Sequence, residues 1–592
     1  MHTPSEDESG TAPLAVVRAQ AGAKKPLAIS AAPVAPPESA DGADADDSDG
    51  HRHPPEQVSR PRVKLPRLSG PWLRRLILVA WPVGLAAAGV ALYLCYLALS
   101  RTEEVTSDGA SNALQAWAML HGNPLLRGWT VTDVSFYTTE LPEYMIVEWV
   151  RGLNADVLHA SAAITYTLVV LTAGLLGRGR AKGREGMVRL FIAAGIVVAP
   201  QFGAGVFILV FQPDHIGTSV PLLLTWLVLD RAPRSWYVPP IIALMLAWGA
   251  IGDQLILLIG VAPLAVVSAV RAYQVLVQRR EGWRSGWFDV SLVVAAAAGA
   301  EISRIVVREI SAHGGYTVLP VPGGVAQITD MSSHLWLLVQ SISGIYGADV
   351  FGMTSFGLSA AIAALHLVGL ALAAWGLWLV IRRFFSCEDR IAQILTVGIL
   401  INLTAYMLST TPTTYWSARE VGPVLPMGAV LAARMLGGRL MKARLVPALS
   451  VALACYLAAL GYTVTKPSIP AVTQTLADWL GQHNLTYGLS SYGISNTTTL
   501  ASGETVNVRP VSWENDYVAG GPYEFDKSWY DPNLHYANFV VLIQPPIPID
   551  PIALWEVRAS FGKPQHVYYF SRYTIMVFNK NLLTDLVPSP PG

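Results

Sequence analysis

Long runs of uncharged, apolar residues recur along the chain and constrain its fold more than any other feature. Two of them, residues 76–100 and 157–177, are as long as the ~20 residues that an α-helix needs to cross a bilayer. Only 14% of the 592 residues are charged, whereas roughly a quarter are charged in a soluble domain. We therefore predict a polytopic α-helical membrane protein.

Eleven apolar runs are predicted to be membrane spans. They cover residues 76–100, 157–177, 190–212, 216–229, 235–250, 255–270, 290–307, a stretch within 351–381, 391–409, 421–433 and 445–463. Arg74 and Arg75 precede the first run, and every second loop after it is again basic. Because positively charged loops stay in the cytoplasm, we expect the N-terminus inside and the C-terminus outside the plasma membrane.

The chain is predicted to have three parts. Residues 1–68 are rich in Ala, Pro, Asp and Ser, which bury too little apolar surface to offset the entropy of ordering, so we expect a disordered cytoplasmic tail. Residues 69–464 form the transmembrane domain, with a first outer loop at 101–156. Residues 465–592 contain short β-branched and aromatic runs such as ANFVVLI and YTIMVFN, which predict a C-terminal extracytoplasmic α/β domain.

Charge and cysteine content argue against two further classes of protein. The formal net charge is zero, which gives no general attraction to nucleic acid. The three cysteines lie in or beside apolar runs, so no disulfide framework is expected in the outer regions.

The first outer loop holds the strongest candidate for chemistry. Asp108 lies past the end of the first span, near aromatic residues such as Trp117 and Trp129. A carboxylate beside an apolar wall can act as a general base near neutral pH. Alternatively, Ser107 or Asp108 caps the helix that is predicted at 110–120.

Polar residues at span ends form four clusters that map to the predicted outer surface. The clusters are Asp108 with Asp133, Glu140 and Glu143; Asp214-His215; Asp253-Gln254; and Arg419-Glu420. Ionisable groups near a membrane are commonly functional or paired. The alternative for each single residue is that it is simply solvated at the end of a span.

Two of these clusters could recognise phosphate. Arg419 starts a short span and could bind phosphate oxygens in bidentate fashion, or it could pair with Glu420. Asp214 and His215 could bind a metal or orient phosphate, or Asp214 could cap the following helix. No Cys/His spacing typical of zinc occurs in the sequence. No cofactor is predicted with certainty, and the use of a divalent metal stays open.

From about residue 72 onward the chain resembles the GT-C class of integral-membrane glycosyltransferases, and within it the protein mannosyltransferases and aminoarabinose transferases. The resemblance rests on TSDGASNALQAWAMLHGNPLL, PDH, GDQLILLIGVAPL and SAREVGPVLPMGAVLAAR. It implies a sugar donor carried on polyprenyl phosphate, a site at the lipid bilayer, and an extracytoplasmic acceptor that is a cell-envelope glycan, lipid or protein.

The family pattern implies roles for particular residues. Asp108 would be the catalytic base, Asp133 or Asp214 the second acidic residue, and Arg419 a neighbour of the lipid phosphate. The predicted substrate-binding residues are Asp133, Glu140, Asp214, His215, Arg419 and Glu420. Two features depart from the family: Asp108 lacks an adjacent acidic partner, and Arg419 is followed by Glu where many relatives have Tyr. They leave the acceptor type and metal use open.

The resemblance implies an inverting displacement. Asp108 would deprotonate an acceptor hydroxyl that attacks the anomeric carbon, and polyprenyl phosphate would leave with its charge stabilised by Arg419, with His215 as a further candidate. Two other functions fit the composition: a polytopic transporter or lipid flippase, and a non-catalytic envelope scaffold. A transporter binds its substrate near the membrane midplane, whereas the polar clusters map to the outer surface.

Overall fold

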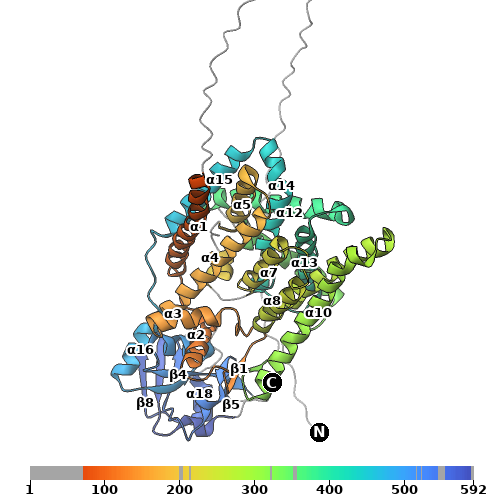
Figure 1. The fold of residues 1–592 in the computed structure, drawn as a ribbon. Coiled ribbons are helices and arrows are strands. Elements are labelled where there is room, and N and C mark those ends of the chain that lie inside the picture. The colour runs from red at the N-terminus through yellow and green to blue at the C-terminus, as the bar shows by residue number, and fades with distance from the viewer. Residues whose placement is uncertain are drawn as a thin grey trace, which may run out of the picture. The chain divides into compact units, whose positions relative to one another are not determined.

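The computed structural model describes residues 71–198, 204–211, 215–319, 323–350, 357–514, 517–521, 523–544 and 554–587. The predicted tail at residues 1–68 and the candidate Asp214 lie outside these ranges. The chain from Pro71 onward forms one compact unit, with helices in its membrane part and a mixed sheet near its C-terminus (Figure 1).

Eight helices in the described part of the chain are long and apolar enough to cross a membrane. They are α1 (Pro71–Ser100), α4 (Asp156–Arg178), the continuous stretch of η2 (Leu257–Val261), α9 (Ala262–Tyr273) and η3 (Gln274–Gln278), α10 (Trp283–Ala312), α12 (Leu358–Arg382), α13 (Arg390–Leu408), α14 (Val424–Lys442) and α15 (Val446–Thr463). Each overlaps a predicted span, and the predicted α-helical, multi-pass class is confirmed.

Three shorter helices overlap the third, fourth and fifth predicted spans: α5 (Gly183–Val198), α7 (Ser219–Arg231) and α8 (Val238–Gly252). They have 16, 13 and 15 residues, fewer than the ~20 that cross a bilayer as a straight helix. The count of eleven spans therefore stays a prediction.

Small residues let three of the membrane helices approach closely. A Cβ atom on Gly177 of α4 would lie 2.5 Å from the Cβ of Ala193 in α5 and 3.1 Å from the Cβ of Ala433 in α14. Helices in lipid associate through such close van der Waals packing, because lipid tails are as apolar as the helix surfaces.

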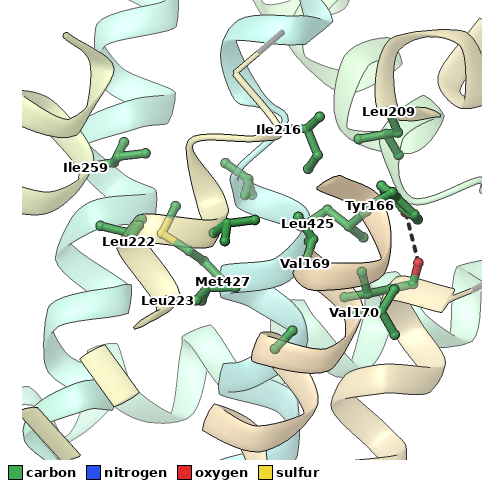
Figure 2. Close-up of a cluster of buried hydrophobic side chains, with 14 of the residues drawn as sticks. Tyr166, Val169, Val170, Leu209, Ile216, Leu222, Leu223, Ile259, Leu425 and Met427 are labelled. Carbon is green, nitrogen blue, oxygen red and sulfur yellow. Dashed lines mark hydrogen bonds between the residues drawn. The ribbon is translucent and has the colours of Figure 1, made fainter. Parts of the chain in front are cut away.

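A buried apolar cluster lies where α4, α7 and α14 meet (Figure 2). Val169, Leu222 and Met427 are members of this cluster, one from each of the three helices, and all are fully buried. The hydroxyl of Tyr166 donates to the carbonyl oxygen of Val197 at 2.9 Å, so the one polar group of that ring is satisfied.

One buried cation joins α7, α13 and α14. Arg434 of α14 is 8% exposed and lies 2.8 Å from a carboxylate oxygen of Asp389 and 2.8 Å from one of Asp230. Asp389 also caps α13, because its side chain accepts from the backbone N–H of Ala392 at 3.1 Å. This pairing explains how Arg434, which the charge pattern places in a basic loop, is instead held inside the protein.

The predicted first outer loop is folded into regular elements. It contains α2 (Ser107–Leu120), β1 (Trp129–Val131) and α3 (Leu141–Arg151). On α3 the apolar Ile146, Trp149 and Val150 are exposed while Glu148 is buried. An exposed apolar face of this kind is typical of a helix that lies in the membrane interface.

A small sheet connects the first outer loop to two distant segments. Its strand order is β2 (Thr317–Val318), β1, β6 (Phe525–Asp526). β1 runs parallel to β2 and antiparallel to β6, and Thr130 is opposite both Thr317 and Phe525. Part of the C-terminal region is thereby fixed directly to the loop that carries Asp108.

The C-terminal region confirms the predicted α/β class. Its sheet has the order β5 (Tyr517–Gly520), β4 (Asn507–Glu514), β3 (Tyr487–Ser490), β7 (Phe539–Ile543), β9 (Tyr573–Val577), β8 (His566–Phe570), and its helices are α16 (Val472–Gln482), α17 (Tyr492–Ala501) and α18 (Leu554–Phe561). β3 is parallel to β4 and β7, and the other pairs are antiparallel. Most of these strands were expected, but β5 and α17 were not.

Short elements complete the connections. They are α6 (Ala204–Val206), η1 (Phe207–Phe211), η4 (Ile328–Asp330), α11 (Met331–Ile345), η5 (Phe384–Ser386), η6 (Tyr415–Val421), η7 (Lys527–Tyr530) and η8 (Leu582–Asp585). The predicted helix at 110–120 is present as α2.

Candidate functional site

Asp108 lies in the first turn of α2, at the end of α2 that packs against α4. Thr106 caps this helix, because its side chain accepts from the backbone N–H of Gly109 at 3.2 Å. The alternative that Ser107 or Asp108 is the cap is therefore wrong. A Cβ atom on Gly109 would lie 1.5 Å from Cδ1 of Leu158 in α4, so glycine is needed here for the first turn of α2 to contact the membrane helix.

Two residues of the C-terminal region are linked to Asp108. Tyr492 contacts it directly, and Glu524 is linked to it through Tyr492. The hydroxyl of Tyr492, at the start of α17, lies 2.9 Å from Oδ1 of Asp108 and 2.7 Å from Oε2 of Glu524. Glu524 is 3% exposed. Burial raises its pKa to about 8, with a further contribution from Asp108. Sequence reasoning missed both Tyr492 and Glu524.

A second group of charged residues is centred on His215. Its Nδ1 lies 2.7 Å from Oδ2 of Asp253, and its Nε2 lies 3.0 Å from Oε2 of Glu420. The hydroxyl of Thr218 also donates to Asp253, and the backbone N–H of Leu255 donates to it at 2.8 Å. The predicted pairs Asp253-Gln254 and Arg419-Glu420 thus contribute to one buried cluster, and His215 joins them.

The charges in this cluster stabilise one another. Burial alone would lower the pKa of His215, but Asp253 and Glu420 raise it well above its usual range. Burial would raise the pKa of both carboxyl groups, and His215 reverses that shift so that both are lowered. A doubly protonated ring can donate to both carboxylates, so His215 is the central cation of the cluster.

Asp133 is positioned beside this cluster by contacts between its segment and the end of α8. Val134 forms an isolated β-bridge with Asp253, and the hydroxyl of Ser135 donates to the carbonyl oxygen of Ile251 at 2.9 Å. Burial raises the pKa of Asp133, while the charge of His215 lowers it. The structure therefore brings Asp133 and His215 together.

Glu140, which is buried, and Glu143, which is partly buried, are two acids at the start of α3. Glu140 lies so close to Gly217 that a Cβ atom there would be 1.6 Å from its Oε1. Burial raises the pKa of Glu140 to about 8 and that of Glu143 to about 7. Glu143 accepts a hydrogen bond from Thr165 of α4 at 2.7 Å. Burial thus raises the pKa of both acids, and Glu140 lies against the turn that carries His215.

Arg419 lies in η6 and is the exposed member of the pair that it forms with Glu420. Its Nε is 3.6 Å from Oε1 of Glu420, and 40% of its side chain is exposed. The ion pair considered from the sequence is present, and the guanidinium remains accessible beside it.

Tyr523 connects the Asp108 group to the Arg419 group. Burial raises its pKa, Glu524 and Asp108 raise it further, and Arg419 lowers it. Its ring also contacts the ring of Tyr492, with 5.4 Å between the ring centroids. Asp108 and Arg419, far apart in sequence, are therefore both near enough for their charges to act on Tyr523.

A metal site is not evident among the residues that the structure describes, where no group of three or more His, Cys, Asp and Glu side chains is arranged to hold an ion. Both ring nitrogens of His215 face carboxylates, which leaves neither for a metal in this arrangement. Asp214, the other residue proposed to bind metal or phosphate, lies outside the described residues.

Comparisons with known proteins give similar folds and no close relative. No family model and no curated protein sequence matches the chain. The Archaeoglobus fulgidus oligosaccharyltransferase, tethered with an acceptor peptide that contains the NVT sequon, is 13% identical with a TM-score of 0.43, and the match covers 78% of this chain and 69% of that chain.

ArnT from Cupriavidus metallidurans is similar in two solved states. Bound to undecaprenyl phosphate it is 12% identical with a TM-score of 0.46, covering 86% of this chain and 99% of that chain. In the apo state it is 14% identical with a TM-score of 0.38, and the match covers 87% of this chain and 100% of that chain. Both neighbours are GT-C glycosyltransferases, the class that the sequence resembles. At these identities and TM-scores the likeness assigns no residue role, substrate or partner to this chain.

Proposed function

We propose that this chain is a membrane glycosyltransferase that moves a sugar from a polyprenyl-phosphate donor to an extracytoplasmic acceptor, with inversion at the anomeric carbon. The observation that carries the proposal is that Tyr523 contacts the ring of Tyr492, whose hydroxyl lies 2.9 Å from Asp108, while the charge of Arg419 also reaches Tyr523. A carboxylate can accept the proton of a hydroxyl group, and a guanidinium can bind phosphate oxygens. Those are the two groups that such a transfer needs.

In the proposed step Asp108 takes the proton of the acceptor hydroxyl. The acceptor oxygen forms a bond to the anomeric carbon while the bond from that carbon to the phosphate oxygen breaks. The electron pair of the broken bond leaves with polyprenyl phosphate, and Arg419 stabilises the added negative charge. An inverting displacement requires the proton acceptor and the phosphate contact to lie on opposite sides of the reacting carbon, and Asp108 and Arg419 are proposed to take these two positions.

His215 is proposed to position Arg419 and not to contact the donor. Both of its ring nitrogens are within 3.0 Å of carboxylate oxygens, one of them on Glu420. Glu420 in turn pairs with Arg419 at 3.6 Å. Asp133 and Glu140 are proposed to line the polar side of the donor site, since both lie against the segment that carries His215.

Tyr492 also lines a cavity of about 440 Å³ that offers space for an acceptor. Glu104 and Val105, which lie between α1 and α2, border it on one side. Arg572 and Tyr573 border it from the C-terminal sheet. The hydroxyl of Tyr492 contacts Asp108 at 2.9 Å. An acceptor in this cavity would thus be separated from the proposed base, Asp108, by Tyr492 alone.

The proposed orientation places this site outside the plasma membrane. The basic residues around Arg74 and Arg178 favour a cytoplasmic N-terminus. Residues 465–592 then form an extracytoplasmic domain, and residues 1–68 a cytoplasmic tail. In this orientation the acceptor is a glycan, lipid or protein of the cell envelope.

The direct test is reconstitution of the full-length protein in liposomes with labelled polyprenyl-phosphate monosaccharides, supplied one sugar at a time. We expect release of polyprenyl phosphate from at least one donor and transfer of its label to added envelope fractions. Movement of the intact labelled lipid between leaflets, without cleavage of the bond between sugar and phosphate, would contradict the proposal and favour a flippase.

A further inference from the structure

Tyr492 lies between two carboxyl groups, and this position limits which of the three groups can carry a proton. Its hydroxyl lies 2.9 Å from Asp108 and 2.7 Å from Glu524. A phenol has one hydrogen to donate and otherwise accepts. If Tyr492 donates to one carboxylate, the other carboxyl group must be protonated and donate to Tyr492 for both contacts to be hydrogen bonds.

The surroundings show which carboxyl group keeps the proton. Glu524 is 3% exposed, with Oε1 3.4 Å from the hydroxyl of Thr132. Burial, followed by the charge of Asp108, raises the pKa of Glu524 to about 8. The titratable groups that face it are Asp108 from α2, Tyr492 from α17, Tyr144 from α3 and its neighbour Tyr523. At neutral pH Glu524 is therefore the carboxyl group that keeps the proton.

The backbone holds Glu524 in this position at a cost. Its φ is 40°, in the left-handed region that non-glycine residues rarely adopt. The next residue, Phe525, pairs with Thr130 of β1, so the strained residue is fixed to the loop that carries Asp108. Strain of this kind persists where the surrounding structure imposes it and is concentrated at functional sites.

We infer that Glu524 is the second carboxyl group of the catalytic site and positions Asp108 through Tyr492, with one proton held by Glu524 and Asp108 left as the base. This inference rests on the proposed role of Asp108. It accounts for the lone acid of the first outer loop, because the partner that the sequence lacks beside Asp108 is supplied by the C-terminal region.

The arrangement gives each proton a defined place. Before transfer, Glu524 donates to Oη of Tyr492, and Tyr492 donates to Asp108. During transfer Asp108 takes the acceptor proton on its other oxygen, and the other two hydrogen bonds are unchanged. When Glu524 loses its proton at alkaline pH, two carboxylates compete for the single hydrogen of Tyr492, and Asp108 is no longer held.

The pH profile of kcat/KM tests this inference in the full-length protein. Wild type should lose activity above about pH 8, about fivefold between pH 8 and 9 for a single ionisation. In Glu524→Gln an amide N–H₂ can donate to Tyr492 at every pH, so the alkaline decline should be absent from its profile. Glu504→Gln is the matched control: Glu504 accepts from Trp117 at 3.0 Å between the same two regions, and its removal should leave the profile unchanged.

A second variant covers the case in which Glu524→Gln does not fold. Tyr492→Phe removes only the bridging hydroxyl, so ionisation of Glu524 can no longer affect Asp108 through it, and the alkaline decline of the profile should be lost. An alkaline decline retained in folded Glu524→Gln, or a wild-type profile in Tyr492→Phe, would overturn the inference.

The two proposals fail differently. If wild type transfers sugar and Asp108→Asn does not, but the Glu524→Gln profile equals that of wild type, only the dyad is refuted. Absence of transfer by wild type overturns both.

Discussion

Nε2 of His215 lies 3.0 Å from Oε2 of Glu420, which joins the turn before α7 to the short helix before α14. Because the other ring nitrogen contacts Asp253 at 2.7 Å, one imidazole neutralises the buried carboxylate of Asp253 and the partly buried carboxylate of Glu420. Removing the central cation should therefore cost more than removing either acid.

We expect His215→Ala to destabilise the protein by roughly 3–5 kcal/mol, the usual cost of leaving a buried charge without its partner. Adding Asp253→Asn to His215→Ala should restore part of that loss, because only one carboxylate then remains uncompensated. Thermal unfolding in detergent measures both. Additive losses in the double variant would show that the two residues do not interact.

The same cluster has a defined pH dependence. The pKa of His215 is raised by its two carboxylates, so its stabilising contribution is complete below the unfolded value of about 6.5 and is lost as pH rises through the folded value. His215→Ala should remove this contribution together with its pH dependence.

Arg419→Ala should weaken donor binding as well as turnover. Loss of a charged hydrogen bond costs about 1.5–3 kcal/mol, which corresponds to roughly a 10- to 150-fold rise in the donor KM. Arg419→Lys should recover only part of the lost donor binding, because lysine keeps the charge but cannot make the bidentate contact. Arg127→Ala, an exposed arginine of the first outer loop, is the control and should leave KM unchanged. An unaltered donor KM in Arg419→Ala would remove the residue from the phosphate site.

Glu148 should make the free energy of unfolding depend on pH. It is 1% exposed, and neither carboxylate oxygen has a hydrogen-bond partner among the described residues. Burial raises its pKa from 4.5 to about 9. A raised carboxyl pKa contributes stability that is complete below about pH 4.5 and is lost as pH rises through 9.

We therefore expect the unfolding free energy of wild type to fall between pH 5 and 9, by up to about 1.4 kcal/mol per pH unit from this one group. Glu148→Gln should reduce that slope. Glu281→Gln, at an exposed site between two membrane helices, should not. Parallel curves for wild type and Glu148→Gln would contradict the prediction.

The proposed orientation can be tested with two cysteines in a background that lacks the three native ones. Lys563→Cys lies at an exposed position between α18 and β8, and Lys182→Cys at an exposed position between α4 and α5. A membrane-impermeant thiol reagent should label the first in intact cells and the second only after the cells are opened. The reverse pattern would invert the topology.

The spans and most strands could be predicted because their signals are local. Apolar length defines α4 and α13, and a continuous apolar run rich in β-branched residues defines β7, each within one segment. α17 could not be predicted, since Thr497, Thr498 and Thr499 have low helix propensity. The helix is stabilised by its burial, and by hydroxyl bonds such as that from Thr498 to the carbonyl oxygen of Ile494 at 2.7 Å.

The site was predictable only where position along the membrane determined it. Asp108, His215 and Arg419 were found because they adjoin spans. The cap of α2 was predicted at Ser107 or Asp108, one or two residues after Thr106, which is the cap in the structure. Glu524 carries no such signal, because its segment GGPYEFD resembles an ordinary turn. Its approach to Asp108 depends on the pairing of β1 with β6, which joins residues from opposite ends of the chain.

The most direct measurement is the turnover of Asp108→Asn with a polyprenyl-phosphate sugar that wild type uses. We expect kcat to fall by roughly 10²–10⁴, the usual contribution of acid–base catalysis, with little change in donor binding. Thermal stability should be nearly unchanged, because Thr106 and not Asp108 caps α2. Asp478→Asn, on the exposed side of α16, is the control and should retain full turnover. Full turnover in a folded Asp108→Asn protein would contradict the account.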